Sequence, residues 1–172
     1  MKRELGKVGS YASFWFMPLH TLPEKKNLDY ANNPSSTAQA IRHAVKLCKA
    51  RGIKTELVIW QVPLWINGGK VYDDFNKIPP DDQAIYDMVK ATVEWFGEDV
   101  DYYGIFHEAN HPKYWDGNWD ELMDLFILPA TRAIRDYEKE TGDKKVISTA
   151  GLSPSRNCKK WYDVQLKSKE LM

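Results

Sequence analysis

Apolar and polar residues alternate along this chain in blocks that fit strands and helices in turn. Short runs rich in β-branched and aromatic residues predict four strands, over 11–17, 55–62, 102–106 and 145–149. Longer segments with apolar residues three or four positions apart predict helices over 34–51, 81–96, 119–141 and 159–171. Because a helix separates each strand from the next, we expect parallel strands covered by helices.

Capping and breaking residues define the ends of these predicted helices. A serine stands at the start of the first helix, and Gly52 follows its end. Asn118 and Glu121 form a pattern close to a capping box before the third helix. Pro129 lies inside that third helix, where a proline removes a backbone hydrogen bond. We therefore expect the third helix to be kinked or split in two.

A loop of unusual chemistry follows the predicted strand 102–106. It reads His107-Glu108-Ala109-Asn110, and the aromatic pair Tyr114-Trp115 comes soon after. In parallel barrel enzymes, catalytic residues lie at the carboxyl ends of the strands. Glu108 is therefore a candidate catalytic carboxylate, and the alternative is that it is a solvated loop residue.

The same segment contains the pattern His-Glu-x-x-His of zinc peptidases, from His107 to His111. Such a site requires a helix, because only a helix projects both imidazoles from one face with the glutamate beside them. Pro112 and the β-favouring residues before His107 disfavour a helix here. We expect no metal site, and a zinc peptidase remains the less favoured alternative.

The chain is rich in aromatic residues, and its balanced charge does not favour a highly charged partner. Aromatic residues reach 13%, with seven Trp and nine Tyr, and several Trp fall near strand ends or in loops, where flat rings suit stacking on sugars. Lys+Arg and Asp+Glu are both 24, without a basic stripe, so neither nucleic acid nor an anionic membrane surface is an expected partner. An apolar run of about 18 residues and an apolar signal region are both absent, so we expect no membrane span and no secretory signal. Two cysteines do not indicate a compartment.

Three strand ends together resemble those of the clan A glycoside hydrolases, which are retaining enzymes built on a (β/α)8 barrel. Pro63-Leu64-Trp65 is similar to the Pro-x-Trp that ends the third strand of that clan. His107-Glu108-Ala109-Asn110 is similar to the Asn-Glu-Pro-Asn of the fourth strand, and residues 146–153 resemble the Val-x-x-x-Gly-Leu-Ser of the fifth. The resemblance covers about residues 11–166 and is nearest to β-xylosidase-like and exopolysaccharide-cleaving members.

The resemblance implies an α/β fold of the (β/α)8 TIM-barrel type that is present only in part. Residues 1–172 would form one incomplete barrel domain with about four βα units, similar to strands two to five. Glu108 would be the general acid/base in the hydrolysis of O-glycosidic bonds in oligo- or polysaccharides, without a cofactor. The expected substrate-binding residues are His107, Asn110, Trp60, Trp65, Tyr114 and Trp115.

Two positions depart from the motif of the clan. His107 stands where an asparagine usually hydrogen-bonds the sugar, as in the similar β-mannanase branch, so the sugar is not defined. Ala109 replaces a proline, which loosens the turn. Strict strand alternation would also point His107 and Glu108 to opposite faces, so a shared site requires a bulge or a twist at the strand end.

The nucleophile of the clan lies at the end of the seventh strand, and no residue of this chain corresponds to it. A complete barrel needs about 250 residues. We therefore expect a second copy of the chain or a missing C-terminal half barrel to complete the domain. The alternative function is a non-catalytic carbohydrate-binding module on the same scaffold.

Overall fold

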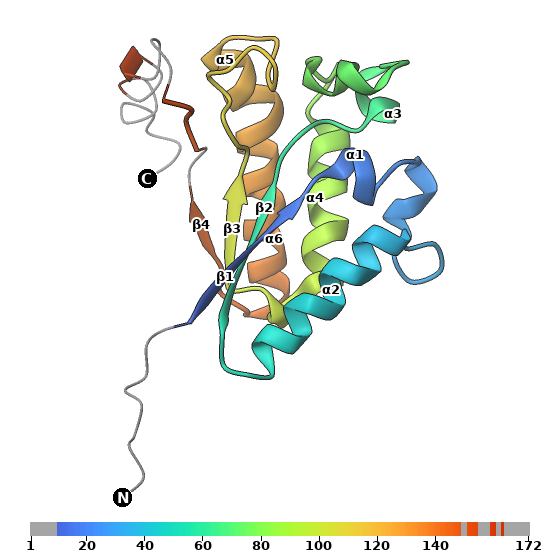
Figure 1. Cartoon of the computed structure of the whole chain (residues 1–172), viewed down its shortest axis with the longest axis vertical. Coiled ribbons are helices and arrows are strands. Elements are labelled where there is room, and N and C mark those ends of the chain that lie inside the picture. The colour runs from blue at the N-terminus through green and yellow to red at the C-terminus, as the bar shows by residue number, and fades with distance from the viewer. Residues whose placement is uncertain (1–9, 149–150, 155–158, 161–162, 164–172) are drawn as a thin grey trace, which may run out of the picture.

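A computed structural model describes residues 10–148, 151–154, 159–160 and 163 of the chain. Four parallel strands form one sheet in the order β1-β2-β3-β4, so that β1 and β4 are its edges (Figure 1). The strands are β1 (Tyr11–Phe16), β2 (Lys54–Ile59), β3 (Tyr102–Ile105) and β4 (Val146–Ser148). All four predicted strands are confirmed, and the sheet has the predicted parallel direction.

Helices connect successive strands and cover one face of the sheet. Figure 1 shows α4 and α6 side by side behind the strands. The connecting helices are α2 (Ser36–Lys49), α4 (Gln83–Phe96), α5 (Trp119–Leu122) and α6 (Leu128–Thr141). Two short helices, α1 (Pro18–Thr21) and α3 (Leu64–Asn67), lie in the loops that follow β1 and β2. The predicted helix 159–171 falls mostly outside the described residues, and no described helix is long and apolar enough to cross a membrane.

The third predicted helix is divided, as Pro129 indicated. One π-helical segment, Met123–Ile127, separates α5 from α6, and Pro129 lies in the first turn of α6, directly after this segment. The predicted capping box closes before α5. The side chain of Asn118 accepts a hydrogen bond from the backbone N–H of Glu121 (3.1 Å), and the carboxylate of Glu121 accepts one from that of Asn118 (2.8 Å).

The other face of the sheet is open among the described residues. In β2, alternate residues are buried under the helices, and those between them, such as Glu56 and Val58, face the open side. Of the five large hydrophobic residues that are exposed in the described part of the chain, three belong to this open face: Tyr11, Trp15 and Val146. A row of exposed apolar side chains on one face marks a surface that binds another molecule or another part of a protein.

A polar cluster crosses the middle of the open face. The carboxylate of Glu56 on β2 accepts hydrogen bonds from the hydroxyl groups of Ser13 on β1 (2.8 Å) and Ser148 on β4 (3.3 Å). To reach β4, this carboxylate passes over β3 at Gly104. A Cβ atom there would stand 3.3 Å from both Glu56 Oε1 and Ser148 Oγ, so glycine leaves room for the crossing.

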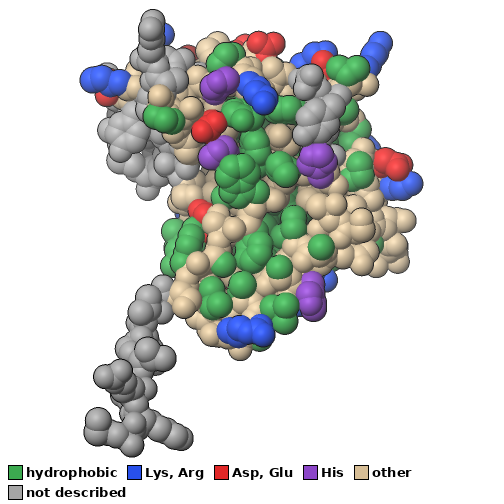
Figure 2. Space-filling view, in the orientation of Figure 1, with side chains coloured by type: hydrophobic (Ala, Val, Ile, Leu, Met, Phe, Trp, Pro, Cys, Tyr) green, Lys and Arg blue, Asp and Glu red, His purple; other side chains and the backbone are tan. Residues whose placement is uncertain are grey.

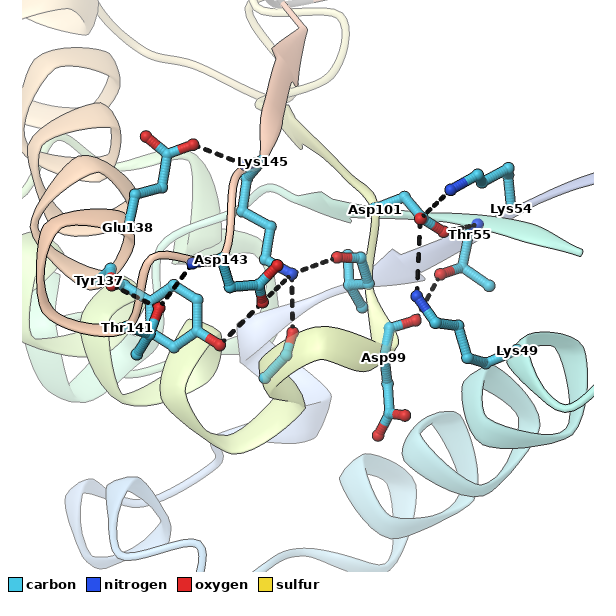
Figure 3. A network of polar contacts seen from close by, with 12 residues as sticks. Lys49, Lys54, Thr55, Asp99, Asp101, Tyr137, Glu138, Thr141, Asp143 and Lys145 are labelled. Carbon is cyan, nitrogen blue, oxygen red and sulfur yellow. Dashed lines mark hydrogen bonds and ion pairs between the residues drawn. The ribbon is translucent and has the colours of Figure 1, made fainter. Parts of the chain in front are cut away.

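A buried ionic network holds the amino-terminal end of the sheet (Figure 3). The Lys145 side chain is only 1% exposed, and its Nζ pairs with Asp143 (2.6 Å). The same ammonium donates hydrogen bonds to the carbonyl oxygens of Gly97 (3.0 Å) and Val100 (2.7 Å). Lys145 thus joins the start of β4 to the connection between α4 and β3.

We expect acid to destabilise the fold through two carboxylates of this region. Burial alone would raise the pKa of Glu138, but hydrogen bonds from the backbone of Lys145 and from Arg135 bring it below the usual 4.5. Burial would likewise raise the pKa of Asp101, but hydrogen bonds from Lys54 and from the backbone of Thr55, together with the nearby charges of Lys49 and Lys54, bring it below the usual 3.8. Carboxyl groups with lowered pKa values stabilise the fold above their unfolded-state pKa and lose this effect as the pH falls through the folded-state value. The free energy of unfolding, measured by urea denaturation, should therefore fall between about pH 5 and about pH 3.

The variant Glu138→Gln serves as the control for this pH dependence. It removes one of the two titrating groups, so its unfolding free energy should be lower at pH 7 and should change less between neutral and acid pH. If the free energy of unfolding changed equally with pH in the variant and in the wild type, Glu138 would not contribute to the acid sensitivity.

Candidate functional site

Backbone strain is concentrated at the carboxyl ends of β2 and β3. In the described part of the chain, the three non-glycine residues with positive φ are Gln61 (72°), Phe106 (68°) and Glu108 (50°). Each such residue costs on the order of 1–3 kcal/mol, and such residues cluster at functional sites. Parallel α/β proteins also bind their ligands at this end of the sheet. Strain and topology therefore indicate the same candidate site.

The backbone turn at Phe106 brings His107 and Glu108 to one side. Phe106 turns its ring into the core, where it is 1% exposed and packs edge-on against Phe126 (4.9 Å between ring centroids). The chain bends again at Glu108, and His107 Nε2 lies 3.8 Å from Glu108 Oε1. The side chains are 29% and 28% exposed, respectively. The twist required for a shared site is present.

The loop after β4 holds this segment in place. The backbone N–H of Glu108 donates a hydrogen bond to the carbonyl of Gly151 (2.7 Å), and His107 forms a parallel bridge with the same glycine. The amide of Asn110 exchanges two hydrogen bonds with the backbone of Ser153, at 2.9 and 2.7 Å. Asn110 is only 2% exposed, so it ties two loops together here, which differs from the substrate contact expected of it.

Aromatic rings surround His107. The ring centroid of Trp15 is 4.6 Å from that of His107, and the centroid of Trp60 is 5.4 Å away. Tyr114, which is partly buried, packs edge-on against Trp60 at 5.2 Å. Trp60 is 4% exposed, whereas Trp15 is 49% exposed. The indole that faces solvent beside the site is therefore Trp15, which was not among the expected substrate-binding residues.

Two other tryptophans expected in the cleft make structural hydrogen bonds. Trp115 is 2% exposed, and its indole N–H donates to the carbonyl of Asn118 (3.1 Å). Trp65 is partly buried, and its indole N–H donates to the carbonyl of Leu22 (2.9 Å), which joins α3 to the end of α1. Burial removes Trp115 from the cleft surface expected for it, while part of Trp65 stays exposed.

Two buried polar atoms at the carboxyl end of β2 have no hydrogen-bond partner among the residues that the structure describes. They are the indole Nε1 of Trp60 and the side-chain Oε1 of Gln61. Leaving a buried donor or acceptor unpaired costs about 1–3 kcal/mol. Together with the positive φ of Gln61, this unused capacity indicates that β2 contributes to the same strained site as β3.

The helix required for a zinc peptidase site is not formed. His107 lies in a β-bridge, and Ala109 and Asn110 form a turn, so His107 and His111 do not project from one helical face. His111 Nδ1 instead accepts a hydrogen bond from the backbone N–H of Lys113 (3.1 Å). Over the described ranges, no group of three or more His, Cys, Asp or Glu is placed to hold a metal ion.

Two further acidic loop residues, Glu24 and Asp116, do not pair with Glu108 in the described part of the chain. Glu24 caps the 3-10 turn Lys25–Leu28 and forms an ion pair with Lys26 (2.9 Å). Asp116 is exposed to solvent. Within the part of the chain that the structure describes, neither forms a hydrogen bond or an ion pair with Glu108, so neither is positioned as its carboxylate partner.

Comparisons with known proteins add support at the level of the fold. No family model matches the sequence, and no curated protein matches it either. Among solved structures, the chain is similar to a family 39 glycoside hydrolase from the gut symbiont Bacteroides cellulosilyticus WH2, with a TM-score of 0.52 over 83% of this chain and 14% identity. The chain spans about a quarter of that structure, since the match covers 26% of it. The likeness shows a parallel α/β arrangement like part of a TIM-barrel-like glycoside hydrolase.

Proposed function

We propose that this chain is part of a glycoside hydrolase-like domain in which Glu108 is the general acid/base. The observation that carries the proposal is the placement of Glu108, a partly exposed carboxylate in a strained turn at the carboxyl end of a central strand, with an imidazole beside it. The fold-level likeness to a family 39 glycoside hydrolase supports the same function. The substrates would be oligo- or polysaccharides with O-glycosidic bonds.

The chemistry assigned to Glu108 has two steps. In the first, its protonated carboxyl group gives a proton to the glycosidic oxygen while a nucleophile bonds to the anomeric carbon and displaces that oxygen; water later displaces the nucleophile. In the second, its carboxylate takes a proton from the attacking water. We assign to His107, whose Nε2 lies 3.8 Å from Glu108 Oε1, the role of hydrogen-bonding the substrate beside this carboxyl group.

We further propose that the nucleophile comes from outside these four βα units. A retaining pair of carboxylates lies about 5 Å apart, and the described loops supply no partner in contact with Glu108. The open sheet face and the 26% coverage of the similar hydrolase support completion by further βα units.

A non-catalytic carbohydrate-binding module is the second candidate, favoured by an exposed indole beside the site and by the lack of a carboxylate partner. The test assays hydrolysis of a panel of aryl glycosides and, in parallel, binding of oligosaccharides by calorimetry. Hydrolysis above the buffer rate supports the catalytic function. Because the nucleophile is proposed to come from outside the four βα units, the assay includes formate, a small anion that can attack in its place. Binding without cleavage under these conditions selects the binding module, and the absence of both rejects both.

A further inference from the structure

We infer that Trp15 is the platform on which a sugar ring of the substrate packs. The inference rests on the proposed function and adds to it a binding residue and a substrate class. Trp15 is the last residue of β1 that faces the open side of the sheet, and 49% of it is exposed. Figure 2 views the molecule from the side on which the strands lie in front of α4 and α6, and it shows hydrophobic side chains gathered there with histidine and acidic side chains close by.

The indole of Trp15 is held in place by two neighbouring rings. The imidazole of His107 lies against it at 4.6 Å and an interplanar angle of 48°, and buried Trp60 meets it edge-on at 5.4 Å and 84°. Trp60 itself is supported by Tyr114 from the loop after β3. A side chain that neighbours hold in one orientation loses little conformational entropy when a ligand packs on it.

The platform lies next to the proposed acid/base. Trp15 contacts His107, and His107 Nε2 is 3.8 Å from the carboxylate of Glu108, so one imidazole separates the exposed indole from the proton donor. A sugar chain whose glycosidic oxygen meets Glu108 can therefore extend a ring over Trp15. The buried Trp60 and Trp115, at 4% and 2% exposure, offer no such surface.

The geometry of an indole selects for one kind of sugar. The face of an aromatic ring is electron-rich and apolar, so it favours a surface of C–H bonds over one of hydroxyl groups. A pyranose ring with equatorial substituents presents C–H bonds on both faces, and β-linkage of such rings keeps the chain flat. The expected ligands are β-linked chains of equatorially substituted pyranoses, and an axial hydroxyl on the packed face should weaken binding.

The test compares three variants of the full chain with the wild-type protein. The probes are β-1,4-linked xylo- and gluco-oligosaccharides of four units, titrated by calorimetry. Trp15→Leu should weaken binding by about tenfold, equivalent to about 1.4 kcal/mol. The affinity of Trp15→Phe should lie between that of Trp15→Leu and that of the wild type. The matched control is Tyr11→Leu, because Tyr11 has the same strand, the same face and 56% exposure but lies four residues away. That separation is about 13 Å along the strand, so this variant should bind like wild type.

Saturation-transfer nuclear magnetic resonance separates stacking from a general structural effect. In the wild type, C–H protons of one sugar face should receive saturation and shift upfield, and both effects should vanish in folded Trp15→Leu. Equal affinity of Trp15→Leu and wild type overturns the platform but leaves the proposed function intact. Binding that depends on Trp15, without cleavage of aryl glycosides even when formate is added in place of the nucleophile, upholds the platform and overturns the catalytic role. A folded wild-type chain that binds none of the probes overturns the platform too.

Discussion

Replacing Glu108 with Gln should lower the rate of glycoside cleavage, measured with formate added in place of the external nucleophile, by about 10²- to 10⁴-fold, the usual contribution of a general acid/base. Glutamine keeps the size and polarity of the side chain but can neither donate nor take the proton. The loss in kcat/KM should be largest for aryl glycosides with poor leaving groups, because these need protonation most. Binding of oligosaccharides should change little, since the contacts of His107 and Trp15 remain. Initial rates across a series of phenols of different acidity would measure the effect.

Two controls make the expected loss specific to Glu108. Asp116→Asn alters an exposed carboxylate of the same loop and should leave the rate within about twofold, as surface substitutions usually do. Glycosides of the most acidic phenols, which leave without protonation, should be cleaved nearly as fast by Glu108→Gln as by the wild type. Unchanged rates in Glu108→Gln would remove this residue from the mechanism, whatever the fate of the other variants.

Replacing Lys145 with Met should destabilise the fold by about 3–5 kcal/mol, the usual cost of breaking a buried ion pair. Methionine has a similar length but removes the ammonium that pairs with Asp143 and donates to two backbone carbonyl groups. The carboxylate of Asp143 and the carbonyl oxygens of Gly97 and Val100 would then lose the donor that they share, which destabilises the fold. A loss of about 3 kcal/mol corresponds to a fall in Tm of roughly 6–12 °C for a chain of this size.

The neighbouring lysine provides a matched control for this prediction. Lys144 is exposed, so Lys144→Met should change the free energy of unfolding by no more than about 0.5 kcal/mol. Thermal and urea denaturation of both variants at pH 7 would measure the difference. Equal losses in Lys144→Met and Lys145→Met would mean that burial of the ammonium does not matter for stability.

Local features of the chain could be predicted from the sequence alone. The capping pair Asn118 and Glu121 forms as expected, and Pro129 coincides with the break between α5 and α6. The strands lie where β-branched and aromatic runs indicated, and Glu108 follows the end of β3. These features depend on periodicity, caps and breakers, which act within a few residues of sequence.

The aromatic part of the site could not be predicted in this way. Trp15, Trp60 and Trp115 occur near strand ends or in the loop after one, yet they are 49%, 4% and 2% exposed. Alternation along a strand divides its residues into two sets but does not say which set the helices cover. Only the docking of α2, α4 and α6 on one face assigns Trp15 to the open side.

By itself, the sequence determined the order of strands and helices and the place of Glu108 after a strand, because short-range preferences decide both. Only the tertiary structure decided that Phe106 turns inward and that His107 and Glu108 share one side, through positive φ at Phe106 and Glu108. Packing against the core and hydrogen bonds to the loop after β4 stabilise these strained conformations. Those partners are distant in sequence, so local pattern carries no record of them.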